Sequence, residues 1–392
     1  MLAYASLYPF QGWRLPEQEL LGWLALKMPA HSSKSDLLVN VIAYVPFGFL
    51  LLRLCRERGG SAPAFLLAAF AGTALSFAME LTQTCLPNRN ASSLDLLTNS
   101  FGTVSGALLA LFWQGSASSG GSLGRWRESR MLPGPLAEIG ILVVLCWALS
   151  QLAPFVPSLD LGGIRNALKP LWYTAHDLSL FRVPDAFTYC CYLSALGLVA
   201  KASLRQSSLA LPFFLIFAGA VLCAKIFVLG RQISTEALGG LLAAAVLLAF
   251  LSGLSRELRC YGGVILVLAG FATYELKGGG GAVRPVGFNW VPFRGQLVRE
   301  LNGFGTILEG IWPFAALSLF LLSRVGARRG VALTGGIITL LFVFLLEWRQ
   351  LAIPGRTAEI TQALLALTGW LAPFFYFRYS QHPPLSADTC EK

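Results

Sequence analysis

The sequence predicts an all-α fold, a polytopic transmembrane helical bundle of about eleven spans. Hydrophobic residues make up 55% of the chain and charged residues only 13%, whereas charged residues average about 25% in soluble domains. The mean hydropathy is +0.63. The apolar residues form blocks near the length of about 20 residues that a helix needs to cross a bilayer. Because these blocks are unbroken rather than alternating, they predict helices and not a β-barrel.

Eleven apolar blocks are long enough to be spans, and basic residues follow every second block. The predicted spans are residues 37–55, 61–84, 94–114, 134–155, 186–204, 208–229, 234–252, 261–276, 306–323, 331–347 and 359–377. The basic loops contain Arg53, Arg56 and Arg58, then Arg125, Arg127 and Arg130, Lys201 and Arg205, Arg256 and Arg259, and finally Arg324, Arg328 and Arg329. The positive-inside rule predicts that these loops are cytoplasmic. The net charge of +10 therefore reflects topology rather than nucleic-acid binding.

The sequence contains no pattern typical of a metal or cofactor site. Its eight cysteines are scattered, without metal-type spacing, and His31, His176 and His382 are isolated. The glycines at 278–281 predict a flexible linker rather than a phosphate-binding loop. The N-terminus lacks the basic start and apolar core of a signal peptide. We therefore expect no cofactor, no metal and no nucleic-acid partner.

Two distant segments share an ungapped pattern. LEWRQLAIPGRTAEITQALLALTG, from Leu346, aligns with MELTQTCLPNRNASSLDLLTNSFG, from Met79. One offset of 267 residues relates seven identical pairs, most of them polar or helix-breaking. The pairs are Glu80/Glu347, Gln83/Gln350, Pro87/Pro354, Arg89/Arg356, Gly102/Gly369, Pro46/Pro313 and Phe47/Phe314. The shared offset predicts an internal repeat.

The repeat predicts three helix groups, at residues 1–130, 131–257 and 258–392. A degenerate middle copy is indicated by Asp185 and Gly197, spaced like Asp36 and Gly48, and by Arg231 and Glu236, spaced within one residue of Arg89 and Asp95. The middle and last groups each contain four predicted spans, whereas the first contains three. We therefore expect that a first helix, encoded upstream of Met1, is missing from the first group.

The stretch DLLVNVIAYVPFGFLL, followed by MELTQTCLPNRNASSLDLLTNSFGTVSG, resembles the VanZ-like family of bacterial membrane proteins. That family is marked by Asp-x3-Asn and Pro-hydrophobic-Gly in one helix, and by Glu-x2-Gln before an arginine-containing loop. The next helix carries Asp-x3-Asn-x2-Gly-x3-Gly. These positions are filled here by Asp36, Asn40, Pro46, Gly48, Glu80, Gln83, Arg89, Asp95, Asn99, Gly102 and Gly106. The resemblance covers residues 5–115 and, more weakly, the C-terminal third.

The spacing of these polar residues predicts a shared pocket at the external surface. Residues three or four apart lie on one helix face, and an acid within a membrane costs roughly 2.5–3.5 kcal/mol unless it has a partner or a function. The predicted pocket consists of Asp36, Asn40, Glu80, Gln83, Arg89, Asp95 and Asn99, and a second site of Glu347, Gln350 and Arg356. No catalytic residue is assigned. Because Ile307, Gln362 and Ala366 replace Asn40, Asp95 and Asn99 in the last group, we expect any activity in the first.

Structural roles compete for the same residues. Asp36 and Asp95 could complement the positive ends of helix dipoles, and an ion pair of Glu80 with Arg89 could close the loop. The glycine stripe, Gly102 and Gly106, is expected to serve close helix packing.

The resemblance implies a protein of the bacterial plasma membrane, with its motif loops outside, that affects susceptibility to glycopeptides, particularly teicoplanin. A transporter or enzyme acting on a lipid-linked envelope precursor remains an alternative, as does a non-catalytic membrane scaffold, so the sequence leaves enzymatic activity open. Residues 7–35, 156–185 and 284–305 combine Trp and Phe with basic residues, which suits the headgroup interface. The expected partners are membrane lipids and a lipid-linked glycan or envelope precursor that these segments help to bind.

Overall fold

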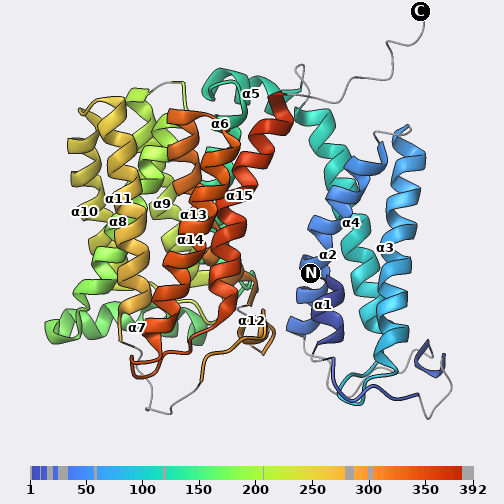
Figure 1. The fold of residues 1–392 in the computed structure, drawn as a ribbon. Helices are drawn as coiled ribbons and strands as arrows, with labels where there is room; N and C mark the ends of the chain where they lie inside the picture. Colours follow the sequence, from blue (N-terminus) through green and yellow to red (C-terminus); the bar gives the residue numbers. More distant parts are fainter. Residues whose placement is uncertain are drawn as a thin grey trace, which may run out of the picture. The chain divides into compact units, whose positions relative to one another are not determined.

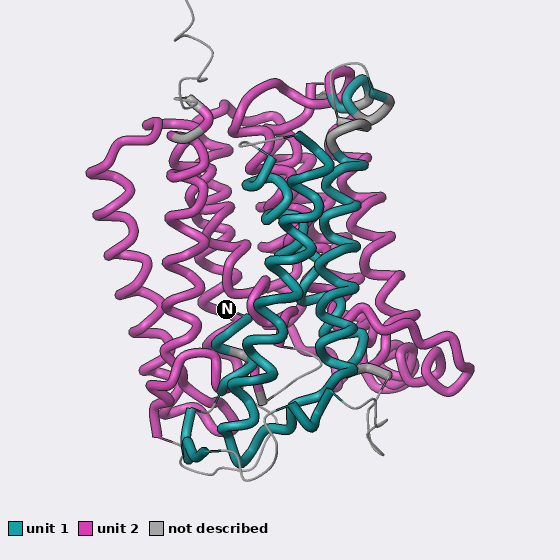
Figure 2. The backbone as a smooth tube through the Cα atoms, turned by 90° about the vertical axis from the view of Figure 1, so that its right-hand side faces the viewer, with its two compact units in different colours: residues 1–127 teal, residues 128–392 magenta. Residues whose placement is uncertain are grey.

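The computed structural model describes residues 2–8, 10–15, 21–24, 34–56, 60–117, 121–205, 207–278, 287–298 and 303–381. Within these ranges the chain is helical, and extended backbone pairs only at isolated bridges. The predicted all-α fold is therefore confirmed. The chain forms two compact units, residues 1–127 and residues 128–392 (Figure 2).

Ten helices in the described ranges are long and apolar enough to cross a membrane. In the first unit they are α2 (Lys34–Arg56), α3 (Ser61–Gln83) and α4 (Ser93–Ala117). In the second unit they are α6 (Pro135–Leu152), α8 (Val183–Ser203), α9 (Ser207–Ala224), α10 (Thr235–Ser252), α13 (Gly303–Val325), α14 (Arg329–Gln350) and α15 (Ile360–Gln381). The other helices are α1 (Leu2–Leu7), α5 (Ser122–Arg130), α7 (Leu161–His176), α11 (Arg256–Leu276) and α12 (Arg294–Val298), with single 3-10 turns at Gly22–Leu24, Leu178–Leu180 and Lys225–Phe227.

The predicted span at 261–276 corresponds to α11, which differs from the other spans in composition. This helix begins at Arg256 and has 21 residues, which is long enough to cross a bilayer. Charged residues at its two ends, among them Glu257 and Glu275, lower its mean hydropathy. Figure 1 shows it running alongside its neighbours in the second unit. By length and composition the described residues thus contain ten spans rather than eleven.

Helices α2 and α4 of the first unit approach each other at glycines. A Cβ atom added to Gly106 would lie 2.0 Å from the carbonyl oxygen of Val45, and one added to Gly48 would lie 2.0 Å from that of Thr103. Gly102 faces α2 in the same way, with its added Cβ 2.5 Å from the Val41 carbonyl oxygen. The two backbones are therefore in contact over two turns, as small residues at such spacing allow.

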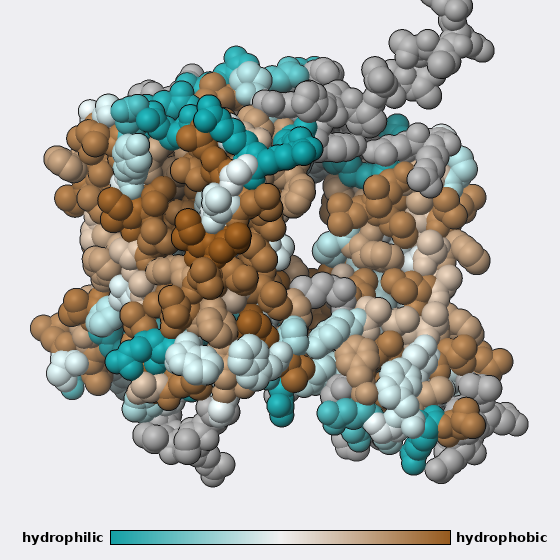
Figure 3. Space-filling view, in the orientation of Figure 1, coloured by the Kyte–Doolittle hydropathy of each residue, from teal (hydrophilic) through white to brown (hydrophobic). Residues whose placement is uncertain are grey.

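The second unit has a large apolar core and a short helix across one end. Trp147, Trp312 and Phe314 are among its largest fully buried side chains. On its visible face, hydrophobic side chains form a band between hydrophilic residues at the two ends (Figure 3). Helix α7 lies at one of these ends, at a steep angle to the spans (Figure 1), and exposes Leu161 and Trp172. The predicted interfacial segment 156–185 thus contains an amphipathic helix of the kind that lies in a headgroup layer.

Candidate functional site

The polar residues predicted in the first unit gather around the loop between α3 and α4. The Asn40 amide Nδ2 donates to the Asp95 carboxylate Oδ1 at 2.9 Å, which joins α2 to the first turn of α4. Glu80 is buried, and its Oε2 accepts from the backbone N–H of Ser92 at 2.8 Å. Glu80 also interacts electrostatically with Asp95 and Arg89. The structure therefore brings these four predicted residues together at one end of the unit.

Arg89 and one further predicted residue, Gln83, bind the end of α1. The Gln83 Nε2 donates to the carbonyl oxygen of Ser6 at 3.0 Å, and the Arg89 Nε donates to that of Tyr8 at 3.0 Å. The last carbonyls of a helix have no partner within it and carry partial negative charge. Gln83 and Arg89 therefore supply donors to carbonyls that α1 itself leaves without partners.

Asn99 lies apart from this loop. Its Nδ2 donates to the Ser76 hydroxyl on α3 at 3.0 Å, while its buried Oδ1 has no hydrogen-bond partner in the described part of the chain. Asp36 lies in the first turn of α2, but its side chain is outside the described atoms. Some of the predicted pocket residues thus form hydrogen bonds that join one helix to another.

Contacts of the same kind recur in the C-terminal segment, at the offset of 267 residues. The Glu347 Oε2 accepts from the backbone N–H of Glu359 at 2.8 Å, as Glu80 does from Ser92. The Arg356 Nε donates to the Glu275 carbonyl oxygen at 3.2 Å, and residue 275 corresponds to Tyr8. In addition, the Gln350 Nε2 donates to the Glu275 carboxylate at 2.6 Å. The predicted second site therefore holds the end of α11 much as its counterpart holds α1.

A third arginine binds a helix end in the middle of the chain. Arg231, in the loop before α10, donates through Nη2 to the Ser150 carbonyl at 3.0 Å and through Nε to that of Ala153, at the end of α6. Phe155 then has a positive φ of 63°, as Phe10 and Phe293 have at 61°. Each of these three phenylalanines follows a proline in the sequence, at positions 9–10, 154–155 and 292–293.

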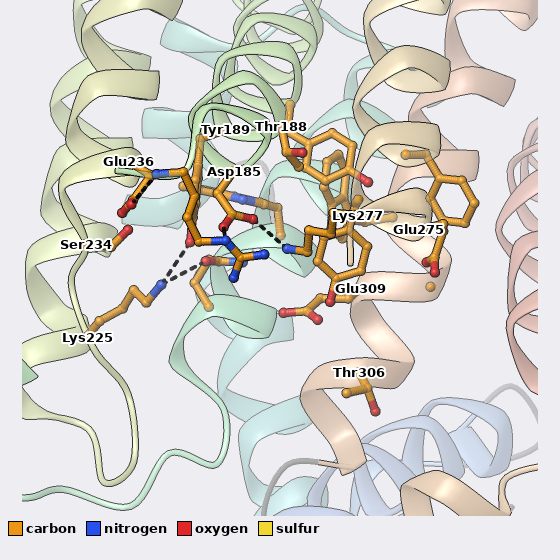
Figure 4. Close-up of a pocket in the computed structure, with 18 of the residues that line it drawn as sticks. Asp185, Thr188, Tyr189, Lys225, Ser234, Glu236, Glu275, Lys277, Thr306 and Glu309 are labelled. Atoms are coloured by element: carbon orange, nitrogen blue, oxygen red, sulfur yellow. Dashed lines mark hydrogen bonds and ion pairs between the residues drawn. The ribbon is translucent and has the colours of Figure 1, made fainter. Parts of the chain in front are cut away.

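A cavity of about 410 Å³ lies in the second unit at the end that contains Arg231. Helices α6, α8, α11 and α13 and the loops beside them contribute its walls (Figure 4). Its charged lining residues are Arg182, Lys225, Arg231, Lys277, Asp185, Glu236, Glu275 and Glu309. Four are basic and four are acidic, so the cavity is suited to a ligand with both hydrogen-bond donors and acceptors.

Ion pairs hold one side of this cavity. Lys277 lies 2.7 Å from the Asp185 carboxylate, which also accepts Arg182 at 3.2 Å. The backbone N–H of Arg182 donates to the Glu236 carboxylate at 3.0 Å. These contacts join the starts of α8 and α10 to the end of α11, and Figure 4 draws them as dashed lines. This wall is therefore fixed and largely neutral.

Two other charged lining residues, Lys225 and Glu309, form no ion pair with any described residue. Lys225 is only 6% exposed, and its Nζ contacts the neutral oxygens of Gln151 at 3.4 Å and Tyr189 at 3.3 Å. Glu309 has no hydrogen bond or ion pair with any described residue, and it interacts at longer range with Lys225, Arg231 and Lys277. Sequence reasoning missed Glu309, although an acid within a predicted span is a signal for function.

Some residues noted in the sequence do line the cavity, whereas the predicted second site does not. Asp185, Arg231 and Glu236, from which the sequence analysis predicted a degenerate middle copy, are part of its wall, as is Gln362. Glu347, Gln350 and Arg356 do not line it. Gln350 contacts its wall through Glu275, and Arg356 does so through Glu275 and Tyr274. The cavity is thus lined by residues from both 131–257 and 258–392.

Comparison with known proteins identifies one part of the chain. Residues 2–114 match the family model described as VanZ/LLP1. No curated protein and no solved structure matches significantly. The matched residues contain every motif position named above, and they fall within the first compact unit with its three spans. This unit of a membrane protein therefore belongs to the VanZ-like family.

Proposed function

We propose that this VanZ-like protein binds the polar headgroup of an amphipathic envelope molecule in the cavity of its second unit. The observation that carries the proposal is the separation of Lys225 from Glu309 across that cavity. A buried cation, or an acid within a membrane-spanning helix, is costly unless it is paired or in use. Here Lys225 contacts only the uncharged side chains of Gln151 and Tyr189, and Glu309 has no direct partner among the described residues. A ligand between them would supply the missing contacts.

The chemistry of the walls favours a headgroup that carries both phosphate and hydroxyl groups. Lys225 and Arg231 would bind the anionic part, while Glu309 would accept hydrogen bonds from hydroxyls. The volume of about 410 Å³ falls in the range of about 300–1,000 Å³ typical of small-ligand sites. A lipid-linked glycan or envelope precursor has this composition, and its lipid tail would remain among the apolar spans.

The orientation and location are part of the same proposal. The positive-inside rule supports a plasma-membrane protein whose cavity and motif loops face the outside of a bacterium, where envelope precursors are used. Binding such a precursor would alter the access of glycopeptides to their target. We therefore expect the protein to lower susceptibility to teicoplanin, the effect that the family resemblance implies.

The recurring contacts support a common origin of the three helix groups. In each group a loop arginine, Arg89, Arg231 or Arg356, donates to carbonyls at the end of the group's first helix. We propose the division at 1–130, 131–257 and 258–392 on this basis. Groups of four helices repeat in the same orientation, so alternating access through inverted repeats is not part of the proposal.

Susceptibility to teicoplanin and vancomycin, measured in a susceptible bacterial host, tests the function. The variants are Lys225→Met and Glu309→Gln in the cavity, and Glu80→Gln and Arg89→Ala in the predicted first-unit pocket. Lys169→Met is the matched control, because this exposed lysine of α7 is not among the residues that line the cavity. Membrane levels are measured by immunoblot for each variant.

The proposal expects that the wild type and Lys169→Met lower teicoplanin susceptibility equally, and that both cavity variants lose the effect at normal membrane levels. If the wild type leaves both susceptibilities unchanged, the envelope role is wrong. If the cavity variants retain the effect while Glu80→Gln loses it, the site is the first-unit pocket instead. Uptake of a substrate into vesicles that depends on Glu309 would favour the transporter alternative.

A further inference from the structure

A second cavity lies at the opposite end of the second unit, away from Lys225 and Glu309. It has a volume of about 330 Å³ and is lined by α6, α8, α11 and α13. Its charged lining residues are all basic: Lys201, Arg205, Arg256 and Arg259. Its apolar lining residues include Leu132, Leu136, Leu198, Leu204, Leu319 and Phe320. It therefore combines a cationic side with a hydrocarbon side.

Backbone oxygens hold three of the cations in place. The Lys201 Nζ and the Arg259 Nη1 both donate to the carbonyl oxygen of Ser252, at 3.1 and 3.2 Å. The Arg205 Nε donates to the Met131 carbonyl at 2.9 Å. Because these acceptors are neutral, the contacts orient the side chains without cancelling their charge. Lys201 and Arg259 also lie close enough to repel one another.

The nearest acid on α11 does not neutralise this cluster. Glu257 forms an ion pair with Arg324 on α13 at 2.5 Å, and neither residue lines the cavity. Like charges beside apolar walls interact more strongly than they would in water. An anion bound between these basic side chains would remove the repulsion and would accept hydrogen bonds from the guanidinium N–H groups that remain free.

We propose that this cavity binds a phosphate group, carried by an anionic phospholipid of the adjacent leaflet or by free phosphate. A guanidinium presents planar paired donors that match phosphate oxygens, and basic pockets between transmembrane helices on the cytoplasmic side bind anionic headgroups. The arginine pattern places this end of the protein in the cytoplasm, where the apolar wall can receive an acyl chain. The site is independent of the proposed headgroup cavity at the other end.

Binding to the purified full chain in mild detergent tests the proposal. Native mass spectrometry and thermal shift are used with phosphatidylglycerol, with phosphatidylcholine and with inorganic phosphate. The variants are Arg256→Gln and the pair Arg256→Gln with Arg259→Gln, and the control is Arg328→Gln, an exposed arginine that does not line this cavity. Because Arg256 is exposed, its single variant remains informative if the pair fails to fold.

We expect phosphatidylglycerol to bind the wild type and Arg328→Gln equally, and each removed lining cation to weaken binding about fivefold. Competition by inorganic phosphate at millimolar concentration would identify the free anion as a ligand of the same site, and its failure to compete would identify the lipid. The proposal is overturned if phosphatidylglycerol binds no better than phosphatidylcholine and phosphate does not bind. It is equally overturned if Arg256→Gln and Arg328→Gln bind alike.

Discussion

Arg356 lies at the junction of α11 with the loop before α15, and its removal should destabilise the second unit strongly. Its guanidinium donates to the carbonyls of Tyr274 and Glu275 and pairs with the Glu275 carboxylate at 3.2 Å. The Glu275 residue is only 5% exposed. Arg356→Ala would leave that carboxylate with Gln350 as its remaining donor. Removing one partner of a buried ion pair costs about 3–5 kcal/mol, so we expect a loss of this size in the free energy of unfolding.

Unfolding in mixed micelles by titration with SDS, followed by tryptophan fluorescence, measures this loss. The series consists of the wild type, Arg356→Ala, Glu275→Gln, the double variant, and Arg349→Ala as a control at an exposed arginine in the last turn of α14. The double variant should be more stable than Arg356→Ala alone, because glutamine leaves no buried charge. A loss below about 1 kcal/mol for Arg356→Ala, the range of exposed pairs, would refute the reasoning, as would a double variant no more stable than Arg356→Ala.

Two further predictions concern other elements. Gly106→Leu should separate α2 from α4 and reduce the folded yield of the full chain, because even a Cβ would lie 2.0 Å from the Val45 carbonyl oxygen. The control is Gly60→Leu, whose Cβ would have no neighbour nearer than 3.8 Å. It should leave the folded yield, measured by size-exclusion chromatography, unchanged. At the start of α7, hydrogen bonds from the Gly163 backbone and the Ser158 hydroxyl lower the pKa of Asp160. The stabilisation by this cap is therefore full above the ordinary carboxyl pKa of about 3.9 and is lost as pH falls through the lowered value. The rate of hydrogen exchange at the Gly163 amide, corrected for its intrinsic rate, should rise in that pH range and should be fast at every pH in Asp160→Ala. A corrected exchange rate that does not change with pH in the wild type would contradict this account.

Most of the fold follows from the apolar blocks alone. The predicted span 61–84 corresponds to α3 at Ser61–Gln83, and 234–252 to α10 at Thr235–Ser252, because a helix in lipid must satisfy its own backbone along its whole apolar length. Helix α11 departs from this simple rule. The mean hydropathy of this helix includes the charge of Glu275. It takes no account of the partners of Glu275, Arg356 and Gln350, which come from distant parts of the chain.

The contacts of the polar residues were harder to predict than their positions. The sequence analysis placed Glu80 and Arg89 in one predicted pocket, but it could not show that Arg89 donates to the end of α1. Every residue carries a carbonyl acceptor, so the sequence contains no mark for the one that is used. Glu309 was missed for a different reason. It lies outside the pattern shared by the first and last groups, since Ile42 is its counterpart at the offset of 267 residues.

The differences between the two aligned segments indicate where a specific function should be sought. The glutamate and arginine contacts recur in both segments, with Glu80 accepting from Ser92 and Glu347 from Glu359. A contact found in both segments is explained by the need of each to hold a loop. The residues that differ have no such explanation. Ile307 and Gln362 stand at the positions of the hydrogen-bonded pair Asn40 and Asp95, and Gln362 lines the cavity.

Glu80→Gln and Glu347→Gln should therefore act mainly through stability, whereas Glu309→Gln should alter ligand binding in a protein that remains folded. Both glutamates of the shared contact are buried and accept a backbone N–H, and an amide that rotates its oxygen toward that donor retains one hydrogen bond but loses the charge. No backbone N–H of the described residues donates to Glu309, so its replacement removes no hydrogen bond that joins helices or loops. Equal loss of folded protein for all three variants would show that Glu309 is part of the same structural array rather than a ligand-binding residue.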